Sequence, residues 1–209
     1  MVKKIRIIVG NSAYKDNSGF GYSRLKVRSL KKSLKNNKLK KIYKKIPEIA
    51  FIPIFEAKFP EEYYKYFDVI SFRRLIFLLF EGEFSMFKEE PEEIAAYFYE
   101  RNIYLVNACG KKNKPTIDNL SRLINNIIVE RFDCNENYEV HVLYTGENAI
   151  KIKGRLGKDK RYKLKEYIYP HPSARGKHQK TCSECWINFT YNGGIYSDSK
   201  SVLKAFREK

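Results

Sequence analysis

Short apolar segments alternate along this chain with longer stretches that have the periodicity of helices. The segments that favour strands are residues 5–9, 49–55, 103–106, 140–145 and 166–169, the second of them interrupted by Pro53. Helices are indicated over residues 23–45, 60–80, 91–101, 116–132 and 198–209, and a helix or turn over residues 148–153. This alternation is typical of a mostly parallel sheet with helices on both faces, so we expect an α/β fold.

The chain is expected to form one domain. Its 209 residues are enough to bury a core, and 43% of them are apolar. We find no internal repeat and no linker that would divide the sequence. Residues 1–209 are therefore interpreted as a single domain.

The charge of the chain is unevenly distributed. The formal net charge is +17, and residues 1–45 hold 15 basic residues and one acidic residue, a net charge of +14. Residues 46–100 have a net charge of −7, and residues 150–180 return to +9. Two basic blocks that the fold brings together would attract a polyanion and release counterions on binding its phosphates. The pattern favours a nucleic-acid partner, and a surface generally rich in lysine is the alternative.

The sequence also favours an intracellular protein. The N-terminus lacks the apolar segment of a signal peptide, and the longest apolar run, Leu75–Phe80, is too short to span a bilayer. Four cysteines are few for a disulfide scaffold, which indicates a reducing compartment. We expect a cytoplasmic protein, associated with the nucleoid, or a nuclear one in a eukaryotic or viral setting, with no membrane partner.

Polar loops follow three of the expected strands. They read Gly-Asn-Ser-Ala-Tyr-Lys at residues 10–15, Asn-Ala at 107–108 and His-Pro-Ser-Ala-Arg at 171–175. In open parallel sheets the ligand crevice lies beyond the C-terminal ends of the strands, so these loops should meet there. Asn107 has the donors and acceptor needed to read a pyrimidine edge, and the ring of Tyr22 can stack on a base.

These loops resemble the motifs of the uracil-DNA glycosylase superfamily. Residues 10–15 match Gly-Gln-Asp-Pro-Tyr-His at the Gly and Tyr positions, and residues 19–23, Gly-Phe-Gly-Tyr-Ser, match Gly-Leu-Cys-Phe-Ser. Residues 105–108 match the end of an apolar strand that reads Leu-Leu-Asn-Ala, and residues 171–173 match His-Pro-Ser. The four motifs occur in the family's order over residues 5 to about 176. The resemblance implies a single three-layer domain with a short, mostly parallel four-stranded sheet, and it leaves residues 177–209 as a C-terminal extension that is atypical of the family.

The resemblance also implies roles for individual residues. Tyr14 would exclude bases with bulky C5 substituents, and His171 would donate a hydrogen bond to the departing base. Ser173 would contact a backbone phosphate, and Lys15 in place of the family's His suits a phosphate as well. The structural alternatives are a core role for Tyr22, a loop cap for Asn107 and a turn residue for His171.

The chain departs from the family at two functional positions. Ser12 stands where the family has the Asp that positions the attacking water, and a hydroxyl is a poor base near neutral pH. Asn11 is a candidate to orient the water instead, and Asp16 and Glu56 are conceivable replacement acids. Arg175 replaces a Leu that wedges into the base stack, and a guanidinium can both wedge and grip phosphate.

Three residues near the C-terminus have part of a zinc-ligand pattern. His178, Cys182 and Cys185 are spaced as His-x3-Cys-x2-Cys, and a fourth ligand would have to come from elsewhere. Two reduced cysteines without a metal are the favoured interpretation. We expect no cofactor and no metal.

The leading hypothesis is a DNA glycosylase that everts and excises uracil or another modified base. Ser12 or Asn11 would place the water, His171 would stabilise the leaving base, and Tyr14, Tyr22 and Asn107 would form the base pocket. The alternative is a catalytically weak or inactive DNA-binding subunit with a processivity or scaffold role beside a protein partner, which Ser12 favours. A third, weaker hypothesis is an RNA-processing or nucleotide-binding α/β protein.

Overall fold

The computed structural model describes residues 3–11, 70–81, 97–109, 117–131, 138–157 and 159–207. The expected strand at 49–55, the basic helix at 23–45 and the site candidates Ser12, Tyr14, Lys15 and Tyr22 lie outside these ranges. The elements in chain order are β1 (Lys3–Gly10), α3 (Ile70–Phe80), β2 (Ile103–Asn107), α5 (Asp118–Arg131), β3 (Tyr138–Thr145), α6 (Glu147–Ile150), β4 (Tyr162–Tyr169), η3 (Gly176–His178), α7 (Gln179–Trp186) and α8 (Ser199–Phe206).

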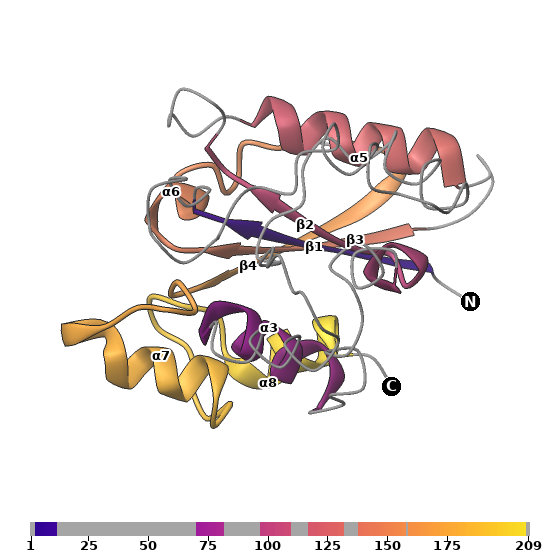
Figure 1. Cartoon of the computed structure of the whole chain (residues 1–209). Coiled ribbons are helices and arrows are strands. Elements are labelled where there is room, and N and C mark those ends of the chain that lie inside the picture. The colour runs from indigo at the N-terminus through magenta and orange to yellow at the C-terminus, as the bar shows by residue number, and fades with distance from the viewer. Residues whose placement is uncertain are drawn as a thin grey trace, which may run out of the picture.

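The four strands form one parallel sheet with the order β2-β1-β3-β4. Helix α5 covers one face, and α3, α7 and α8 cover the other (Figure 1). The prediction of a three-layer α/β domain with a four-stranded parallel sheet is thereby confirmed. Because β1 and β3 are central strands covered on both faces, their inner residues are apolar almost without interruption.

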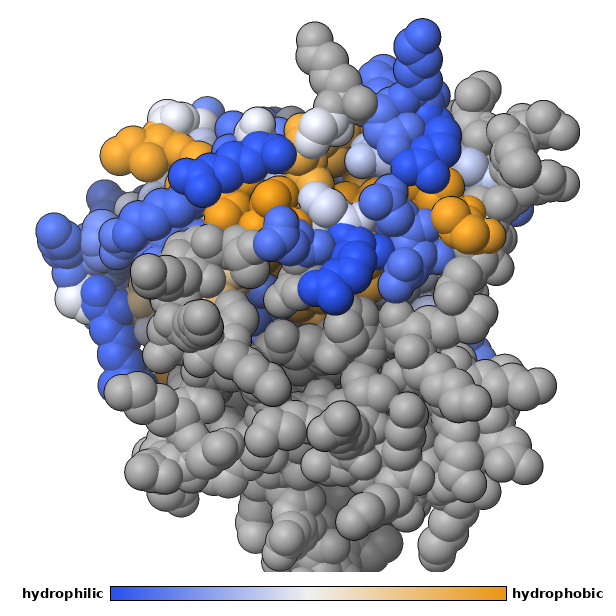
Figure 2. All heavy atoms as spheres, turned by 90° about the horizontal axis from the view of Figure 1, so that it is seen from above, coloured by the Kyte–Doolittle hydropathy of each residue, from blue (hydrophilic) through white to orange (hydrophobic). Residues whose placement is uncertain are grey.

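The two helical layers differ in composition. Figure 2 views the molecule from the α5 side, and the described part of this face is mainly hydrophilic with hydrophobic side chains between. Helix α5 buries Leu120, Leu123, Ile124, Ile127 and Ile128 against the sheet. Helix α3 is more apolar and buries seven of its eleven residues, because α7 and α8 pack around it on the side away from the sheet.

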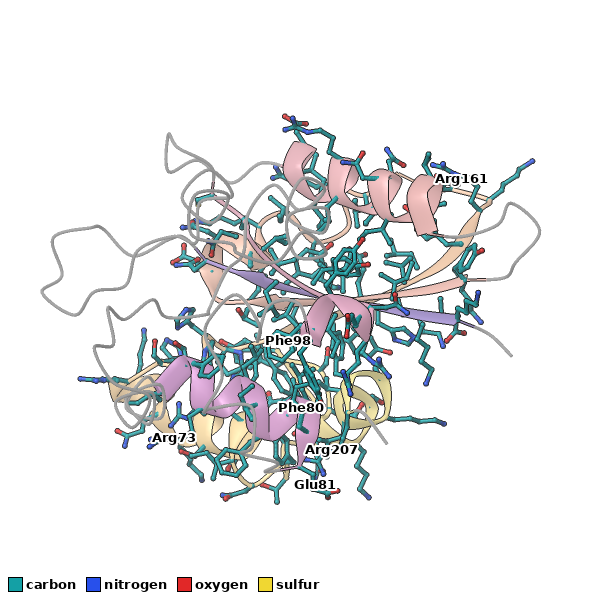
Figure 3. All side chains as sticks on the ribbon, turned by 45° about the vertical axis from the view of Figure 1, so that its right-hand side comes forward. Arg73, Phe80, Glu81, Phe98, Arg161 and Arg207 are labelled. Carbon is teal, nitrogen blue, oxygen red and sulfur yellow. The ribbon has the colours of Figure 1, made fainter. Side chains whose placement is uncertain are left out.

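Contacts around the end of α3 connect it to distant segments. The rings of Phe80 and Phe98 stack with their centroids 5.6 Å apart, and Arg207 donates to Glu81 at 2.8 Å (Figure 3). On the other face of the sheet, Arg161 at the start of β4 donates to Asn125 of α5 at 2.8 Å. The chain end after α8 is thus tied to α3, and β4 is tied to α5.

The expected elements agree with the described ones except in the C-terminal third. Strand β4 begins at Tyr162, four residues before the predicted start at 166. Lys163 and Lys165 alternate with partly buried Leu164, which an edge strand with a solvated side permits and which made this stretch resemble a basic loop. Helix α7 was not predicted.

Residues 177–207 are an integral part of the packed layers. Cys182, Cys185 and Trp186 from α7, together with Val202 and Phe206 from α8, are fully buried in the core. None of the helices in the described ranges is long and apolar enough to cross a membrane.

Candidate functional site

The C-terminal ends of all four strands lie along one edge of the sheet. Gly10 pairs with Asn107 in the β1–β2 register, and Thr145 pairs with Tyr169 in the β3–β4 register. Hydrogen bonds continue the pairing beyond the strands: Ala108 N donates to Gly10 O at 2.8 Å, and Gly146 N donates to Tyr169 O at 3.3 Å. The loops that follow the strands are therefore held side by side, as the sequence predicted for residues 11, 107 and 171.

Gly146, the first residue after β3, brings two of the candidate residues together. A Cβ atom built on Gly146 would lie 3.2 Å from His171 Cβ and 3.5 Å from Asn11 Cβ. The backbone of Gly146 has φ 84° and ψ 167°, a conformation that is almost exclusive to glycine. Only a residue without a side chain fits here, and its absence of a Cβ allows the loops after β1 and β4 to approach each other.

Asn11 acts as a tie between neighbouring loops. Its Oδ1 accepts a hydrogen bond from Asn148 N at 2.7 Å, and its carbonyl oxygen accepts one from Cys109 N at 3.3 Å. Asn11 thereby connects the segment after β1 to the start of α6 and to the segment after β2. A carboxamide oxygen has a second lone pair, so this tie is compatible with an additional contact to a water molecule.

Asn107 is one of few buried polar side chains in the described part of the chain. It is the last residue of β2, it is 8% exposed, and it lies beside Gly10 in the register. A carboxamide at this place is costly to bury unless its polar atoms are hydrogen-bonded. Its position at the strand end is the one that the sequence predicted for a residue reading the edge of a base.

His171 is held in one protonation state. Its Nδ1 lies 3.2 Å from the amide nitrogen and 2.8 Å from the hydroxyl oxygen of Ser173. Because an amide can only donate, Nδ1 is an acceptor and the hydrogen of the neutral imidazole is on Nε2. Burial lowers the pKa of His171 to about 4, so the ring is neutral at physiological pH. His171 Nε2 is therefore a neutral hydrogen-bond donor.

The loop that bears His171 is supported from below. His171 O accepts from Ala174 N at 2.9 Å, which closes a turn, and Pro170 O accepts from Trp186 Nε1 at 2.8 Å. Trp186 itself is fully buried and packs edge-on against Tyr169. The Ser173 hydroxyl, which the family resemblance assigned to a phosphate, is hydrogen-bonded to His171.

Exposed basic side chains follow β3 and β4 near this edge. Helix α6 begins directly after Gly146 and is followed by exposed cations, as is the His171 loop: Lys151, Lys153, Arg155, Arg175, Lys177 and Lys180. Lys151 forms an ion pair with Glu147 at 2.7 Å, but both groups are exposed, so the pair contributes little to stability. These residues supply the positive charge that the sequence predicted for residues 150–180.

The three residues of the partial zinc pattern do not share a site. Cys182 and Cys185 are fully buried, whereas His178 is exposed. Among the described residues, no group of three or more His, Cys, Asp or Glu side chains is arranged to hold a metal ion. Burial raises the pKa of both thiols, that of Cys185 to about 12, so both cysteines are protonated.

Sequence reasoning brought Asn11, Asn107 and His171 to the correct edge and missed three residues that build it. Gly146 had a weak signal, since the turn after residue 145 matches a small-residue turn of the family. Arg74 and Trp186 had none, because their contacts with the His171 loop join segments far apart in the chain. Ser12, Tyr14, Lys15 and Tyr22 are not described, so their predicted roles stay predictions.

The low pKa of His171 predicts a pH-dependent stability. The folded pKa of about 4 lies below the ordinary value of 6.5, so the unfolded chain binds the proton more tightly. Stability is complete above pH 6.5 and is lost as the pH falls toward 4, with a contribution from His171 of about 2 kcal/mol between pH 7 and pH 5. Urea unfolding at both pH values should show this difference in the wild type and a smaller one in His171→Gln. His178→Gln, at an exposed position, should leave it unchanged; equal pH dependence in all three proteins would contradict the buried neutral ring.

Comparisons with protein-family models, with curated proteins and with solved structures give no significant match to this chain.

Proposed function

We propose that this protein binds DNA, holds an everted base at the C-terminal edge of its sheet and removes uracil or another modified base. The observation that supports the proposal best is His171, a neutral imidazole with its hydrogen on Nε2, packed against Gly146 and beside Asn11. This combination matches what the resemblance to uracil-DNA glycosylases implies for the His-Pro-Ser motif.

The proposed chemistry needs a donor where negative charge develops. When the bond between the sugar C1′ and the base nitrogen breaks, its electron pair stays with the base and charge accumulates on the base oxygens. A neutral donor already fixed in place stabilises this charge, and such a donor contributes roughly 3 kcal/mol to the barrier. His171 Nε2 is suited to this task, because its hydrogen-bonded Nδ1 fixes the tautomer.

The other residues of the proposed site recognise the base and place the water. Asn107 reads the base edge, Tyr22 stacks on the ring, and Tyr14 excludes bulky C5 substituents. The attacking water, placed by Ser12 or Asn11, adds its oxygen to C1′ and releases one proton. The bonding of Asn11 Oδ1 to Asn148 N holds this side chain in a fixed orientation.

DNA is the proposed partner because the same edge is flanked by exposed cations. Lys151, Lys153 and Arg155 follow α6, and Arg175 and Lys177 follow the His171 loop. Such contacts to phosphates give affinity that falls as salt is raised. A DNA partner places the protein in the cytoplasm at the nucleoid, or in a nucleus.

The test is base excision from oligonucleotides that contain one uracil, single-stranded and double-stranded, with abasic sites measured by alkaline cleavage. We expect excision by the wild type and a rate about 100-fold lower in His171→Ala, since a donor to the transition state is lost. His178→Ala is the matched control and should retain the wild-type rate, because His178 is exposed and outside the site. Absence of cleavage of uracil and of other modified bases, or equal rates for both variants, would reject the enzymatic proposal.

A non-catalytic DNA-binding subunit is the second candidate, and Ser12 is the observation that favours it. Without a carboxylate near the sugar, the pocket would hold a base and leave the glycosidic bond intact, next to a protein partner that supplies the activity. In the same assay Ser12→Asp should then introduce excision that the wild type lacks. Salt-sensitive DNA binding without turnover in either protein would support binding alone.

A further inference from the structure

Arg74 of α3 reaches the loop that bears His171 from the opposite side of that loop. Its Nη1 donates a hydrogen bond to Pro172 O and contacts Cys182 Sγ at 2.9 Å. Arg74 is 98 residues away from Pro172 in the sequence, and its helix packs against α7, which contains Cys182. A partly buried guanidinium therefore holds the middle of the His171–Ser173 segment.

The carbonyl that Arg74 holds belongs to the same peptide unit as the amide that holds His171. Pro172 O and Ser173 N are the two ends of one trans peptide, so they point in opposite directions and turn together. Arg74 donates to the oxygen, while the amide of Ser173 donates to His171 Nδ1 at 3.2 Å. A cation at the oxygen also polarises the peptide and strengthens the amide as a donor.

The thiol of Cys182 reinforces the same arrangement. Cys182 Sγ lies 3.4 Å from His171 O and 3.6 Å from Pro172 O, and burial raises the pKa of this thiol, so it remains a donor. The carbonyl groups of residues 171 and 172 are both held by groups from outside the loop. A rotation of the peptide that carries the Ser173 amide would break the contacts with Arg74 and Cys182 together.

We infer that Arg74 is a positioning residue that fixes His171 with its hydrogen on Nε2, acting through the Pro172–Ser173 peptide. The inference deepens the proposed function, because this hydrogen is the one offered to the departing base. It concerns the state of the imidazole itself, so it is tested without DNA and independently of any excision activity.

The experiment is a nitrogen-15 NMR spectrum of the imidazole groups at pH 7 in protein labelled at histidine, which has only three such residues. In the wild type, His171 should show an unprotonated Nδ1 and a protonated Nε2. In Arg74→Met the ratio of this tautomer to the other should fall about tenfold, the effect expected for the loss of one hydrogen bond's contribution. Arg73→Met, the same change one residue earlier on α3, should leave the ratio unchanged, and Trp186 fluorescence reports whether each variant is folded. A folded Arg74→Met protein with the wild-type ratio would overturn the inference.

A measurement on the unmodified protein covers the case in which Arg74→Met does not fold. Rotation and hydrogen exchange of the Arg74 guanidinium should be slow, with a nuclear Overhauser contact between its Nη hydrogens and residues 172–173. Arg74→Lys keeps a cationic donor and should retain the wild-type tautomer of His171. Fast exchange of the Arg74 guanidinium, or loss of the tautomer in a folded Arg74→Lys protein that keeps this contact, would contradict the inference.

Discussion

Gly146→Ala should lower the free energy of unfolding by about 2 to 4 kcal/mol, the sum of backbone strain and overpacking. The strain arises because φ at Gly146 is 84°, and the overpacking because the new Cβ would lie 3.2 Å from His171 Cβ and 3.3 Å from His171 Cδ2. Since the loss is a large part of the stability of an ordinary domain, the midpoint of urea unfolding should fall markedly.

The matched control for this change is Gly157→Ala. Gly157 lies in the same connection between β3 and β4, it has no positive φ, and a Cβ there meets nothing within 4 Å. Its unfolding midpoint should stay within the error of the wild type. Equal midpoints for Gly146→Ala and the control would mean that Gly146 does not bring the loops after β1 and β4 together.

Trp186→Ala should cost about 3 to 5 kcal/mol of stability, the range for removing a large buried aromatic side chain. Trp186 is fully exposed to neither solvent nor a loose packing environment: its exposure is 0%, its ring packs against Tyr169, and its Nε1 donates to Pro170 O. The loss removes support directly before His171, so the proposed site should be weakened as well.

Circular dichroism during chemical unfolding is the suitable measurement, because Trp186 is the only tryptophan and its fluorescence is lost in the variant. Ile187→Ala is the control, since the next residue is 52% exposed and its truncation leaves no cavity. A change of less than about 1 kcal/mol in Trp186→Ala would contradict the burial and the hydrogen bond described for this residue.

The elements that the sequence predicted well are those whose pattern is local. Residues 5–9 and 103–106 are continuous apolar segments, as buried parallel strands require, and the helical period of residues 116–132 matches the buried face of α5. The start of β4 was missed because an edge strand alternates Lys163 and Lys165 with apolar residues and thus lacks that signal. Helix α7 was missed because its buried face consists of two cysteines and one tryptophan within eight residues.

The candidate site was predicted to a similar degree and for a similar reason. Asn11, Asn107 and His171 each follow a strand directly, so the topology of a parallel sheet was enough to bring them to one edge. The tautomer of His171 depends on the Ser173 amide and, through one peptide, on Arg74, and no local pattern encodes such a long-range contact. The function itself stays a prediction from the motifs and the chemistry of this edge.

The most direct measurement follows the three histidines while DNA is added to histidine-labelled protein. The ligand is a single-stranded oligonucleotide with one 2′-fluorinated deoxyuridine, in which the electron-withdrawing fluorine slows glycosidic cleavage, and the reference is the same oligonucleotide with thymine. Binding of the base at the sheet edge should shift the Nε2 resonance of His171 with the uracil ligand alone, while His141, buried between β-strand and α8 side chains, stays unchanged. Saturating DNA binding that leaves His171 Nε2 unshifted would contradict a nucleobase site formed by Asn11, Asn107 and His171.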